Sequence, residues 1–340
     1  MSASFLLGTD APLREAFDAA LVDLDGVAYR GPHAIPSAPG ALREARDAGM
    51  RIVFVTNNAS REPEEVSGHL TELGIPTLPH EVLTAAQAVA RLAASELPPA
   101  ATVLPVGGAG LRTALKLAGF ELVASADAHP DAVIQGFAPD VSWRELAEAA
   151  YAIQGGAAYF ASNLDLTLPN ERGIAPGNGS LVATVVNATG VVPRSAGKPE
   201  PAMFHLAAEH VGAQRPLAIG DRLDTDLRGA RAAGVPGLLV LTGVSSAADA
   251  VLALPDERPS FIGTDLGCLG EAQPEPVRDG DAWMVRGNRA RVSGSRLELD
   301  GPRGIDRLRA ACAAAWDAAD RGETIDAGRL PDLGVWSPHE

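Results

Sequence analysis

The chain has 340 residues, of which 46% are hydrophobic, so it can form two or three domains with a well-packed core. Its formal net charge of −15 argues against nucleic acid as a partner, because phosphate backbones bind basic patches. No apolar run approaches the ~18 residues of a membrane span, and the start lacks the features of a signal peptide. We therefore expect no membrane partner. The two cysteines, Cys268 and Cys312, fit a cytoplasmic protein without disulfides, and we expect both to be inert core residues.

The first expected strand covers residues 19–24 and leads into Asp23-Leu24-Asp25-Gly26. Alternate residues of a strand point to opposite faces, but here the chain is already turning. Both carboxylates can therefore reach the crevice where open α/β sheets bind ligands. Two carboxylates so close repel each other unless a cation or a shared proton lies between them. A simple turn, in which Asp and Gly are common, explains the same residues.

A helix is expected at 41–48, then a second buried strand at 51–56 that ends in Thr56-Asn57-Asn58. One hydroxyl and two amides, with the backbone N–H groups of the turn, can hold phosphate oxygens without adding charge. The same triplet also suits the start of a helix or a turn. A helix at 63–73 completes a βαβα pattern, which predicts a parallel sheet with helices on both faces.

The next hundred or so residues carry a complete set of elements of their own, with Ser142 and Glu145 as a capping box before one helix. We therefore expect an inserted domain at 82–194. Its clearest elements are strands at 102–106, 132–136 and 158–161 and helices at 111–118 and 143–154.

The core pattern resumes at Gly197-Lys198-Pro199, followed by a helix at 201–211. Lys198 lies in a rigid, crowded place where a compact ammonium fits better than a planar guanidinium. The other lysine, Lys116, lies on an expected helix, and we interpret it as a solvated surface charge.

The strand at 217–219 ends in Gly220-Asp221, which places Asp221 at a strand end like the first two aspartates. Carboxylates, backbone carbonyls and waters suit Mg²⁺, and no His/Cys cluster favours zinc. Asp224 and Asp226 can instead cap the helix expected at 226–233, a role that we retain for Asp224. A last core strand is expected at 237–241.

After Cys268 the composition changes, and residues 271–276 are typical of a linker. Short strands at 282–285 and within 289–299, with hairpin turns at 286–288 and 294–296, precede a helix at 305–320. This tail resembles a fragment of the acetyltransferase fold but is too short for the whole, and lacks a Gly-rich loop that opens a helix for coenzyme. We expect packing, dimerisation or regulation here, so a homodimer is one open assembly.

In chain order the segments D-x-D-G, T-N-N, G-K-P and G-D-x-x-x-T-D resemble the haloacid dehalogenase superfamily of phosphatases, specifically the subclass IIA, nitrophenylphosphatase-like group. The resemblance covers roughly residues 16–268. It implies an α/β fold with a Rossmann-like parallel-sheet core, a large inserted α/β cap and, outside the resemblance, a small C-terminal α+β domain. The expected boundaries are 1–81 and 195–270 for the core, 82–194 for the cap and 271–340 for the linker and tail.

The resemblance also implies roles for the residues at the strand ends. Asp23 would be the nucleophile and Asp25 the general acid and base. Mg²⁺ would bind the Asp23 carboxylate, the Asp25 carbonyl and Asp221, while Asp226 would orient a metal-bound water or Lys198. The phosphate would be held by groups of two turns: Thr56, Asn57, Asn58 and Lys198.

The stretches 162–169 and 176–180 are similar to the substrate loop of that subclass's cap. A solvated surface loop explains the same polar residues equally well. The loop contains no aromatic residue to stack a base or pyridine ring, which favours glycerol 3-phosphate or 2-phosphoglycolate over a nucleotide or pyridoxal phosphate. A phosphotransferase or mutase would fit the same motifs, and so would a catalytically retired binding protein. The candidate loop residues are Asn163, Asp165, Thr167, Asn170, Glu171 and Arg172.

Overall fold

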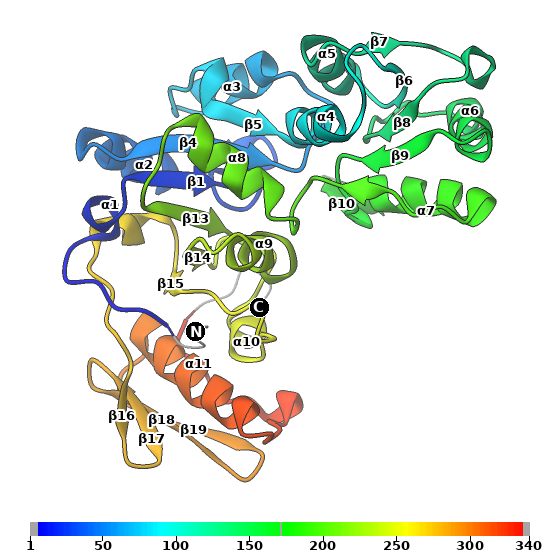
Figure 1. Ribbon diagram of the computed structural model, residues 1–340. Helices are drawn as coiled ribbons and strands as arrows, with labels where there is room; N and C mark the ends of the chain where they lie inside the picture. Colours follow the sequence, from blue (N-terminus) through cyan, green and yellow to red (C-terminus); the bar gives the residue numbers. More distant parts are fainter. Residues whose placement is uncertain (1–5, 171, 336–340) are drawn as a thin grey trace. The chain divides into compact units, whose positions relative to one another are not determined.

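The computed structural model describes residues 6–170 and 172–335. By its internal contacts the chain divides into two compact units, each built from separate stretches of sequence. Unit 1 comprises Met1–Val53, Leu73–Ile75 and Ala208–Glu340, and unit 2 comprises Phe54–Glu72 and Pro76–Ala207. The chain contains two parallel sheets of five or more strands, and Figure 1 shows the elements along the chain.

The sheet that carries the D-x-D-G segment has the strand order β15-β14-β13-β1-β4-β5. Its strands pair in parallel wherever the register is defined, which confirms the expected α/β core. The strands β1, β14 and β15 are buried along their whole length, as expected when helices cover both faces. The bounds are β1 Ala19–Val22, β4 Arg51–Thr56, β5 Val82–Thr84, β13 Pro216–Gly220, β14 Gly237–Val240 and β15 Phe261–Gly263.

Helices follow these strands close to the expected positions. The helix expected at 41–48 begins earlier, because Pro39 is tolerated in the first turn of a helix. The helices of this part are α1 Leu13–Ala16, α2 Ala38–Asp47, α3 Pro63–Glu72, α8 Ala202–His210, α9 Arg228–Ala232 and α10 Ala247–Val251. Shorter elements are β2 Tyr29–Arg30, β3 His33–Ala34, η1 Pro79–Glu81, η3 Leu223–Leu227 and η4 Leu266–Gly270.

Unit 2 contains a second parallel sheet in the order β12-β9-β8-β6-β7. The expected capping box is present: the Ser142 hydroxyl accepts from Glu145 N–H and the Glu145 carboxylate accepts from Ser142 N–H. Lys116 is exposed on its helix, as expected. The strands are β6 Thr102–Val106, β7 Glu121–Leu122, β8 Ala132–Gln135, β9 Ala158–Ala161 and β12 Arg194–Ser195, with helices α5 Ala109–Leu117, α6 Trp143–Gln154 and η2 Ala126–Ala128.

Two helices and a hairpin of unit 2 are missing from the sequence interpretation. Helix α4 (Ala85–Glu96) begins with a capping box of Thr84 and Gln87, a signal that the sequence does contain. Helix α7 (Asn178–Thr189) starts in a Gly-Asn-Gly stretch that is typical of a turn. The hairpin consists of β10 (Thr167–Asn170) and β11 (Gly173–Pro176).

The C-terminal tail is an antiparallel sheet covered by one helix, as expected, but the sheet has four strands, because β16 precedes the strands that the sequence predicts. The strands are β16 Val277–Asp279, β17 Ala282–Val285, β18 Asn288–Ser293 and β19 Arg296–Asp300, followed by α11 Ile305–Asp320 and η5 Ala327–Arg329. Both predicted hairpin turns are confirmed by the pairs Val285–Asn288 and Ser293–Arg296. Helix α11 lies between this sheet and α10 (Figure 1).

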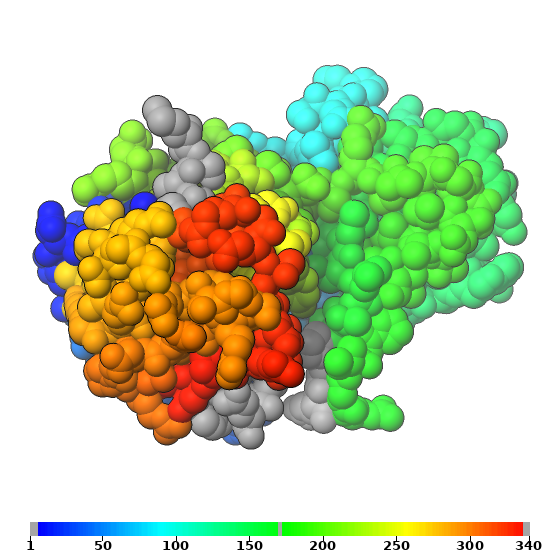
Figure 2. Space-filling model, turned by 90° about the horizontal axis from the view of Figure 1, so that it is seen from below, coloured from blue at the N-terminus to red at the C-terminus, as the bar shows by residue number. Residues whose placement is uncertain are grey.

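The tail shares a hydrophobic core with the rest of unit 1. Leu239 of β14, Ile262 of β15 and Ala250 of α10 belong to one buried cluster with Val285 and Trp316 of the tail. In Figure 2 the residues of the tail, coloured orange to red, adjoin one another and form one continuous patch of the surface. Packing, one of the three roles expected for the tail, is therefore present.

The segment 271–276, which we expect to be a linker, is held by hydrogen bonds to other parts of unit 1. Gln273 is buried, and its backbone exchanges hydrogen bonds with Thr9: Thr9 N–H donates to the Gln273 carbonyl (2.8 Å), and Gln273 N–H donates to the Thr9 hydroxyl (2.9 Å). The Arg309 guanidinium donates to the Gln273 side chain at 2.6 Å. These partners come from distant parts of the sequence, so the segment is ordered by contacts that its composition does not indicate.

The cysteines are free and buried, as expected. Burial raises the pKa of the Cys268 thiol to about 12 and that of the Cys312 thiol still further above its usual range. In the described part of the chain, no helix combines the length and the apolar character needed to span a bilayer.

Candidate active site

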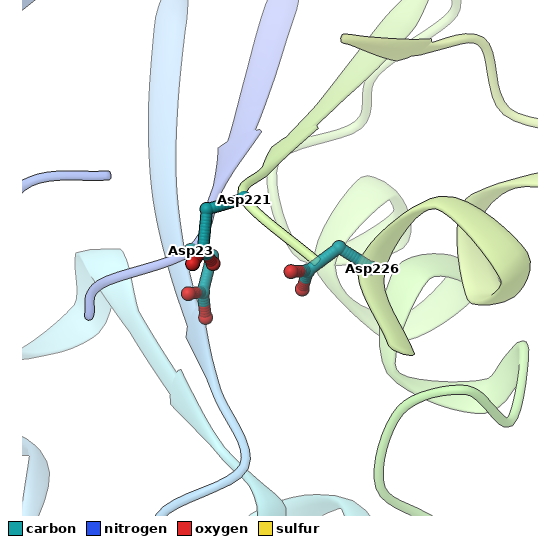
Figure 3. Close-up of side chains that lie close together, drawn as sticks. All are labelled: Asp23, Asp221 and Asp226. Carbon is teal, nitrogen blue, oxygen red and sulfur yellow. The ribbon is translucent and has the colours of Figure 1, made fainter. Parts of the chain in front are cut away.

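Three aspartates of unit 1 bring their carboxylates together. Asp23 follows β1, Asp221 follows β13, and Asp226 belongs to the π-helical turn η3, and one carboxylate oxygen of each lies within 4.8 Å of the others. Figure 3 shows the three side chains. Asp221 and Asp226 are only 1% and 3% exposed, while Asp23 is half-buried. From the sequence, we expect side chains that follow parallel strands to meet at one edge of the sheet, and Asp23 and Asp221 do so. We call this expectation the strand-end rule.

Glycines make room for this cluster. A Cβ on Gly26 would lie 2.5 Å from Oδ2 of Asp221, and one on Gly243 would lie 1.8 Å from the same oxygen. A Cβ on Gly220 would lie 2.2 Å from the Cβ of Asp226. Contacts under 3.0 Å are essentially never made by real Cβ atoms, so these positions require glycine. Gly243 was missed in the sequence, although it follows β14 and the strand-end rule could have found it.

Backbone N–H groups aim two of the carboxylates. Val244 N–H donates to Oδ2 of Asp221 at 2.6 Å, and Arg222 N–H donates to Oδ2 of Asp226 at 3.1 Å. The cluster offers oxygen ligands alone, which is the donor set that a hard divalent cation such as Mg²⁺ prefers. The glycine cradle and this donor set therefore fit a magnesium ion.

Asp25 lies in the turn after β1 and is exposed. The turn is closed by Gly26 N–H, which donates to the Tyr29 carbonyl at 2.8 Å, and Gly26 has a φ of +84°, a conformation that favours glycine. The Asp25 side chain is thus accessible, and it is not one of the three clustered carboxylates.

The capping role expected for Asp224 is wrong. Asp224 lies inside the turn η3, and its carboxylate accepts from the Arg222 guanidinium at 2.7 and 3.0 Å. Burial works to raise the pKa of Asp224, but the Arg222 hydrogen bond and charge outweigh it, so the pKa lies below its usual range. The helix expected from 226 starts at Arg228, because a π-helical turn takes up the preceding residues.

In unit 2, the polar turn after β4 is stabilised by hydrogen bonds of its own side chains. Asn58 N–H donates to the hydroxyl of the buried Thr56 at 3.1 Å. The Asn58 side-chain oxygen in turn accepts from the Ser60 N–H and hydroxyl, both at 2.8 Å. The side chain of Asn58 therefore stabilises the turn.

The Asn57 side chain joins this turn to Lys198. Lys198 N–H donates to Asn57 Oδ1 at 2.8 Å, and Asn57 Nδ2 donates to the Lys198 carbonyl at 3.1 Å. Lys198 is 4% exposed, and its ammonium donates to the Val55 carbonyl at 3.3 Å. A Cβ on Gly197 would lie 2.4 Å from the Ser162 carbonyl oxygen, so this glycine allows the close approach of the lysine turn.

The candidate substrate loop divides into two parts. Asn163 and Asp165 belong to the Asn57 network: Asn163 Nδ2 donates to the Asn57 carbonyl at 2.7 Å, and Asn57 Nδ2 donates to the Asp165 carboxylate at 3.0 and 3.2 Å. Buried Asn178, which lies in the expected loop stretch 176–180 but was not among its candidate residues, donates to the Asn163 carbonyl at 2.8 Å.

Three of the other loop candidates, Thr167, Asn170 and Arg172, lie in or next to the strands of the hairpin. Thr167 and Asn170 are in β10, Thr167 and Arg172 are exposed, and Glu171 lies outside the described residues. The roles given to all the site residues remain predictions.

Three family models match separate stretches of the chain. Residues 20–121 match the family model described as haloacid dehalogenase-like hydrolase, and residues 195–269 match one described as HAD-hydrolase-like. Residues 285–335 match the model of a GCN5-related N-acetyltransferase like domain. The tail's expected likeness to an acetyltransferase fragment is therefore confirmed.

Two curated relatives are phosphatases. The D-glycerol 3-phosphate phosphatase of Mycobacterium tuberculosis is 42% identical over 317 residues, which cover 90% of this chain and 88% of the relative. An acid sugar phosphatase of Staphylococcus aureus is 38% identical over 235 residues, which cover 68% of this chain and 90% of the relative.

Solved structures agree in fold. The glycerol phosphate phosphatase from Mycobacterium tuberculosis in complex with magnesium has a TM-score of 0.83 at 41% identity, with 90% of this chain and 92% of that one covered. A double-mutant thermostable NPPase from Geobacillus stearothermophilus has a TM-score of 0.67 at 34% identity, with 74% and 96% covered.

The clustered carboxylates at the strand ends of the parallel sheet suit a metal-dependent enzyme, and the chain belongs to the haloacid dehalogenase-like hydrolases. More particularly, it is a phosphatase similar to the nitrophenylphosphatase-like members of subclass IIA, with Mg²⁺ as its cofactor.

Proposed function

We propose that this phosphatase hydrolyses glycerol 3-phosphate, with 2-phosphoglycolate and acidic sugar phosphates as the nearest competitors. The substrate rests on the 42% identity to a D-glycerol 3-phosphate phosphatase across 90% of the chain. The loop without aromatic residues agrees, because nothing in it could stack on a nucleobase or pyridine ring. The carboxylate cluster is the observation that carries the chemistry itself.

Asp23 is the proposed nucleophile. Its carboxylate oxygen attacks phosphorus, the bond from phosphorus to the alcohol oxygen breaks, and an aspartyl-phosphate forms. Asp25 gives its proton to the departing alcohol oxygen and then takes a proton from the water that attacks the aspartyl-phosphate. Inorganic phosphate leaves and the Asp23 carboxylate is restored. The exposure of Asp25 supports this role, because a general acid must reach the substrate.

Asp23, Asp221 and the Asp25 carbonyl would hold Mg²⁺, and the position of Asp226 supports adding its carboxylate to this set, directly or through a water. When bound, the ion supplies the positive charge that lets a carboxylate approach a phosphate dianion. The residues themselves fix where that charge lies, because glycines and backbone N–H groups leave them little freedom.

Lys198 and the turn after β4 are proposed to hold the phosphate. A buried ammonium is costly unless anionic or polar groups surround it, and a phosphate adds such a group. The proposed contributors are Thr56, Asn57, Asn58 and Lys198.

The domain division proposed is a core of 1–81 and 195–270, a cap of 82–194 and a tail of 271–340. The two compact units divide the chain differently, because Phe54–Glu72 and Lys198 both fall in unit 2. In addition, β5 (Val82–Thr84), at the start of the proposed cap, pairs with β4 of the core sheet. A cytoplasmic location and a homodimer are proposed on the composition and the tail, and nucleic acid is not proposed as a partner.

The test is a panel of phosphate monoesters ranked by kcat/KM with and without Mg²⁺. It includes glycerol 3-phosphate, 2-phosphoglycolate, a sugar phosphate, a nucleoside monophosphate, pyridoxal phosphate and 4-nitrophenyl phosphate. Glycerol 3-phosphate is expected to rank first among the natural esters. A higher rank for a nucleotide or pyridoxal phosphate would overturn the substrate, and transfer of phosphate to an added alcohol would indicate a phosphotransferase.

A further inference from the structure

The amide of Asn57 contacts two different segments of unit 2. Its Oδ1 accepts from Lys198 N–H and its Nδ2 donates to the Lys198 carbonyl, at 2.8 and 3.1 Å. This pairing fixes which end of the amide is which, because the opposite orientation would set donor against donor. The second N–H of Nδ2 then serves the Asp165 carboxylate, whose oxygens lie 3.0 and 3.2 Å away.

Asp165 is itself held firmly by its backbone. Its N–H donates to Asn163 Oδ1 at 3.2 Å, and its carbonyl accepts from Gly179 N–H at 2.8 Å, in the first turn of α7. A Cβ on Gly177 would lie 2.3 Å from the Asp165 carbonyl oxygen, so glycine is needed there. The Asp165 side chain therefore starts from a fixed backbone and is directed toward Asn57.

At the other end, Lys198 is confined by close packing. It is 4% exposed, and Gly197 before it approaches Asn57 Oδ1 so closely that a Cβ would lie 2.9 Å away. Where the Lys198 backbone lies decides where its ammonium lies. A change at Asn57 is therefore transmitted directly to the position of the charge.

We propose that Asp165 is a positioning residue that acts through Asn57 on Lys198, and does not select the leaving group of the substrate. This inference rests on the proposed role of Lys198 in holding the phosphate. A hydrogen bond to a carboxylate is about twice as strong as one between neutral groups, so the negative charge of Asp165 holds the Asn57 amide in place. Because phosphate is common to all substrates, loosening this link should affect all of them alike.

The first experiment uses Asp165→Asn in the full chain with saturating Mg²⁺. It measures kcat and KM for 4-nitrophenyl phosphate and glycerol 3-phosphate, and the inhibition constant of inorganic phosphate. Losing the charge but keeping an acceptor should raise both KM values and the inhibition constant by about five- to tenfold. The ratio of the two esters' kcat/KM should stay within about twofold, since the phosphate is shared.

A matched control is Asp131→Asn. Asp131 also lies in unit 2, and its carboxylate accepts from the Thr102 N–H and hydroxyl at 2.7 and 2.9 Å, outside the Asn57 network. Asp131→Asn removes one negative charge, as Asp165→Asn does, and disturbs comparable hydrogen bonds. It should leave the inhibition constant of inorganic phosphate unchanged. An equal rise in both variants would show a general loosening of the unit and overturn the inference.

A double variant tests the link itself. Asn57→Asp places two carboxylates opposite each other, and should weaken phosphate binding strongly. Adding Asp165→Asn to it returns a donor to the contact, so the same substitution that harms the wild type should improve this variant. If it worsens both, the two residues are not coupled and the inference is wrong.

The remaining outcomes separate this inference from the proposed function. If Asp165→Asn impairs glycerol 3-phosphate alone and leaves the phosphate inhibition constant unchanged, Asp165 reads the leaving group, and only the inference fails. Unchanged kinetics for both esters would also overturn the inference alone. A wild-type chain that hydrolyses neither ester would remove the proposed function and this inference with it.

Discussion

At the scale of single residues, the aspartate cluster depends on three carboxylates and on three neighbouring glycines that have no side chain. Three carboxylates approach within 4.8 Å because Gly26, Gly220 and Gly243 leave the space that a Cβ would fill. Backbone N–H groups then fix the directions of Asp221 and Asp226. Chemistry and backbone geometry can therefore be tested separately.

Asp23→Asn should abolish turnover, because an amide is a poor nucleophile and a weaker metal ligand. The fold should persist, as judged by an unchanged thermal unfolding midpoint. Asp224→Asn is the matched control, since this carboxylate contacts Arg222 outside the cluster and should keep most of the activity. If the purified Asp23→Asn protein retained a tenth of wild-type activity, Asp23 would not be the nucleophile.

Gly243→Ala should weaken Mg²⁺ binding by about 10–100-fold, the usual effect of disturbing the groups around a metal ligand. The added Cβ would lie 1.8 Å from Oδ2 of Asp221, so the carboxylate must move. The Mg²⁺ concentration at half-maximal activity measures this. Gly40→Ala, whose Cβ would meet nothing within 4 Å, is the control and should leave that concentration unchanged. Equal Mg²⁺ dependence in both variants would show that the space at Gly243 is not needed to position the Asp221 carboxylate.

At the scale of elements, Asp18 holds the starts of three strands in register. Its carboxylate accepts from Gln214 and Arg215 N–H, each at 2.9 Å, and pairs with Arg51 of β4 at 3.0 Å. Burial works to raise the pKa of Asp18, but these hydrogen bonds and charges outweigh it and lower the pKa. Asp18 therefore stabilises the fold most when ionised.

Asp18→Asn should lower the free energy of unfolding by about 2 kcal/mol near pH 7. Because the folded pKa is lowered, this contribution is fully present above the unfolded value of about 3.9 and is lost as the pH falls through the folded value. Urea unfolding across this range measures the difference between variant and wild type. A difference that grew on acidification would have the wrong sign and contradict the assignment.

We expect the hairpin β10–β11, which carries candidate residues of the substrate loop, to select the ester. Arg172 is exposed in its turn region, unlike Asp165, which belongs to the Asn57 network. Arg172→Ala should change the order of natural esters in the panel, while 4-nitrophenyl phosphate, bound mainly through its phosphate, changes by less than about threefold. A uniform loss for every ester would place Arg172 with the phosphate-binding groups instead.

At the scale of the whole molecule, the tail should unfold together with the rest of unit 1. Trp316 of α11 is 1% exposed, its indole N–H donates to the Ala250 carbonyl at 3.0 Å, and it belongs to a core that includes β14 and β15. The Arg258 guanidinium also pairs with Asp320 of α11 at 2.8 Å. These contacts make the tail a structural part of the unit.

Trp316→Ala should lower the free energy of unfolding by about 3–5 kcal/mol and leave the ranking of esters unchanged. Trp143→Ala is the control, because that side chain is 78% exposed and should cost little. Removal of 272–340 should give an unstable or aggregating chain. A stable truncated protein with a reordered substrate panel would place the tail in the active site.

The sequence by itself determined the parallel core, the tail and the strand-end placement of Asp23 and Asp221. Strand periodicity and the positions where apolar runs end are local properties, so they can be read without coordinates. The capping box at Ser142 and both tail hairpins follow from local signals for the same reason.

Only the tertiary structure decided which polar groups meet. In the structure Asp224 accepts hydrogen bonds from Arg222 and does not cap a helix. Gln273 is hydrogen-bonded to Thr9 and Arg309, and Gly243 lies against the carboxylate of Asp221. Asn57 and Asp165 are 108 positions apart, yet their side chains are in contact. Such contacts depend on packing between distant segments, which leaves no periodic trace in the sequence.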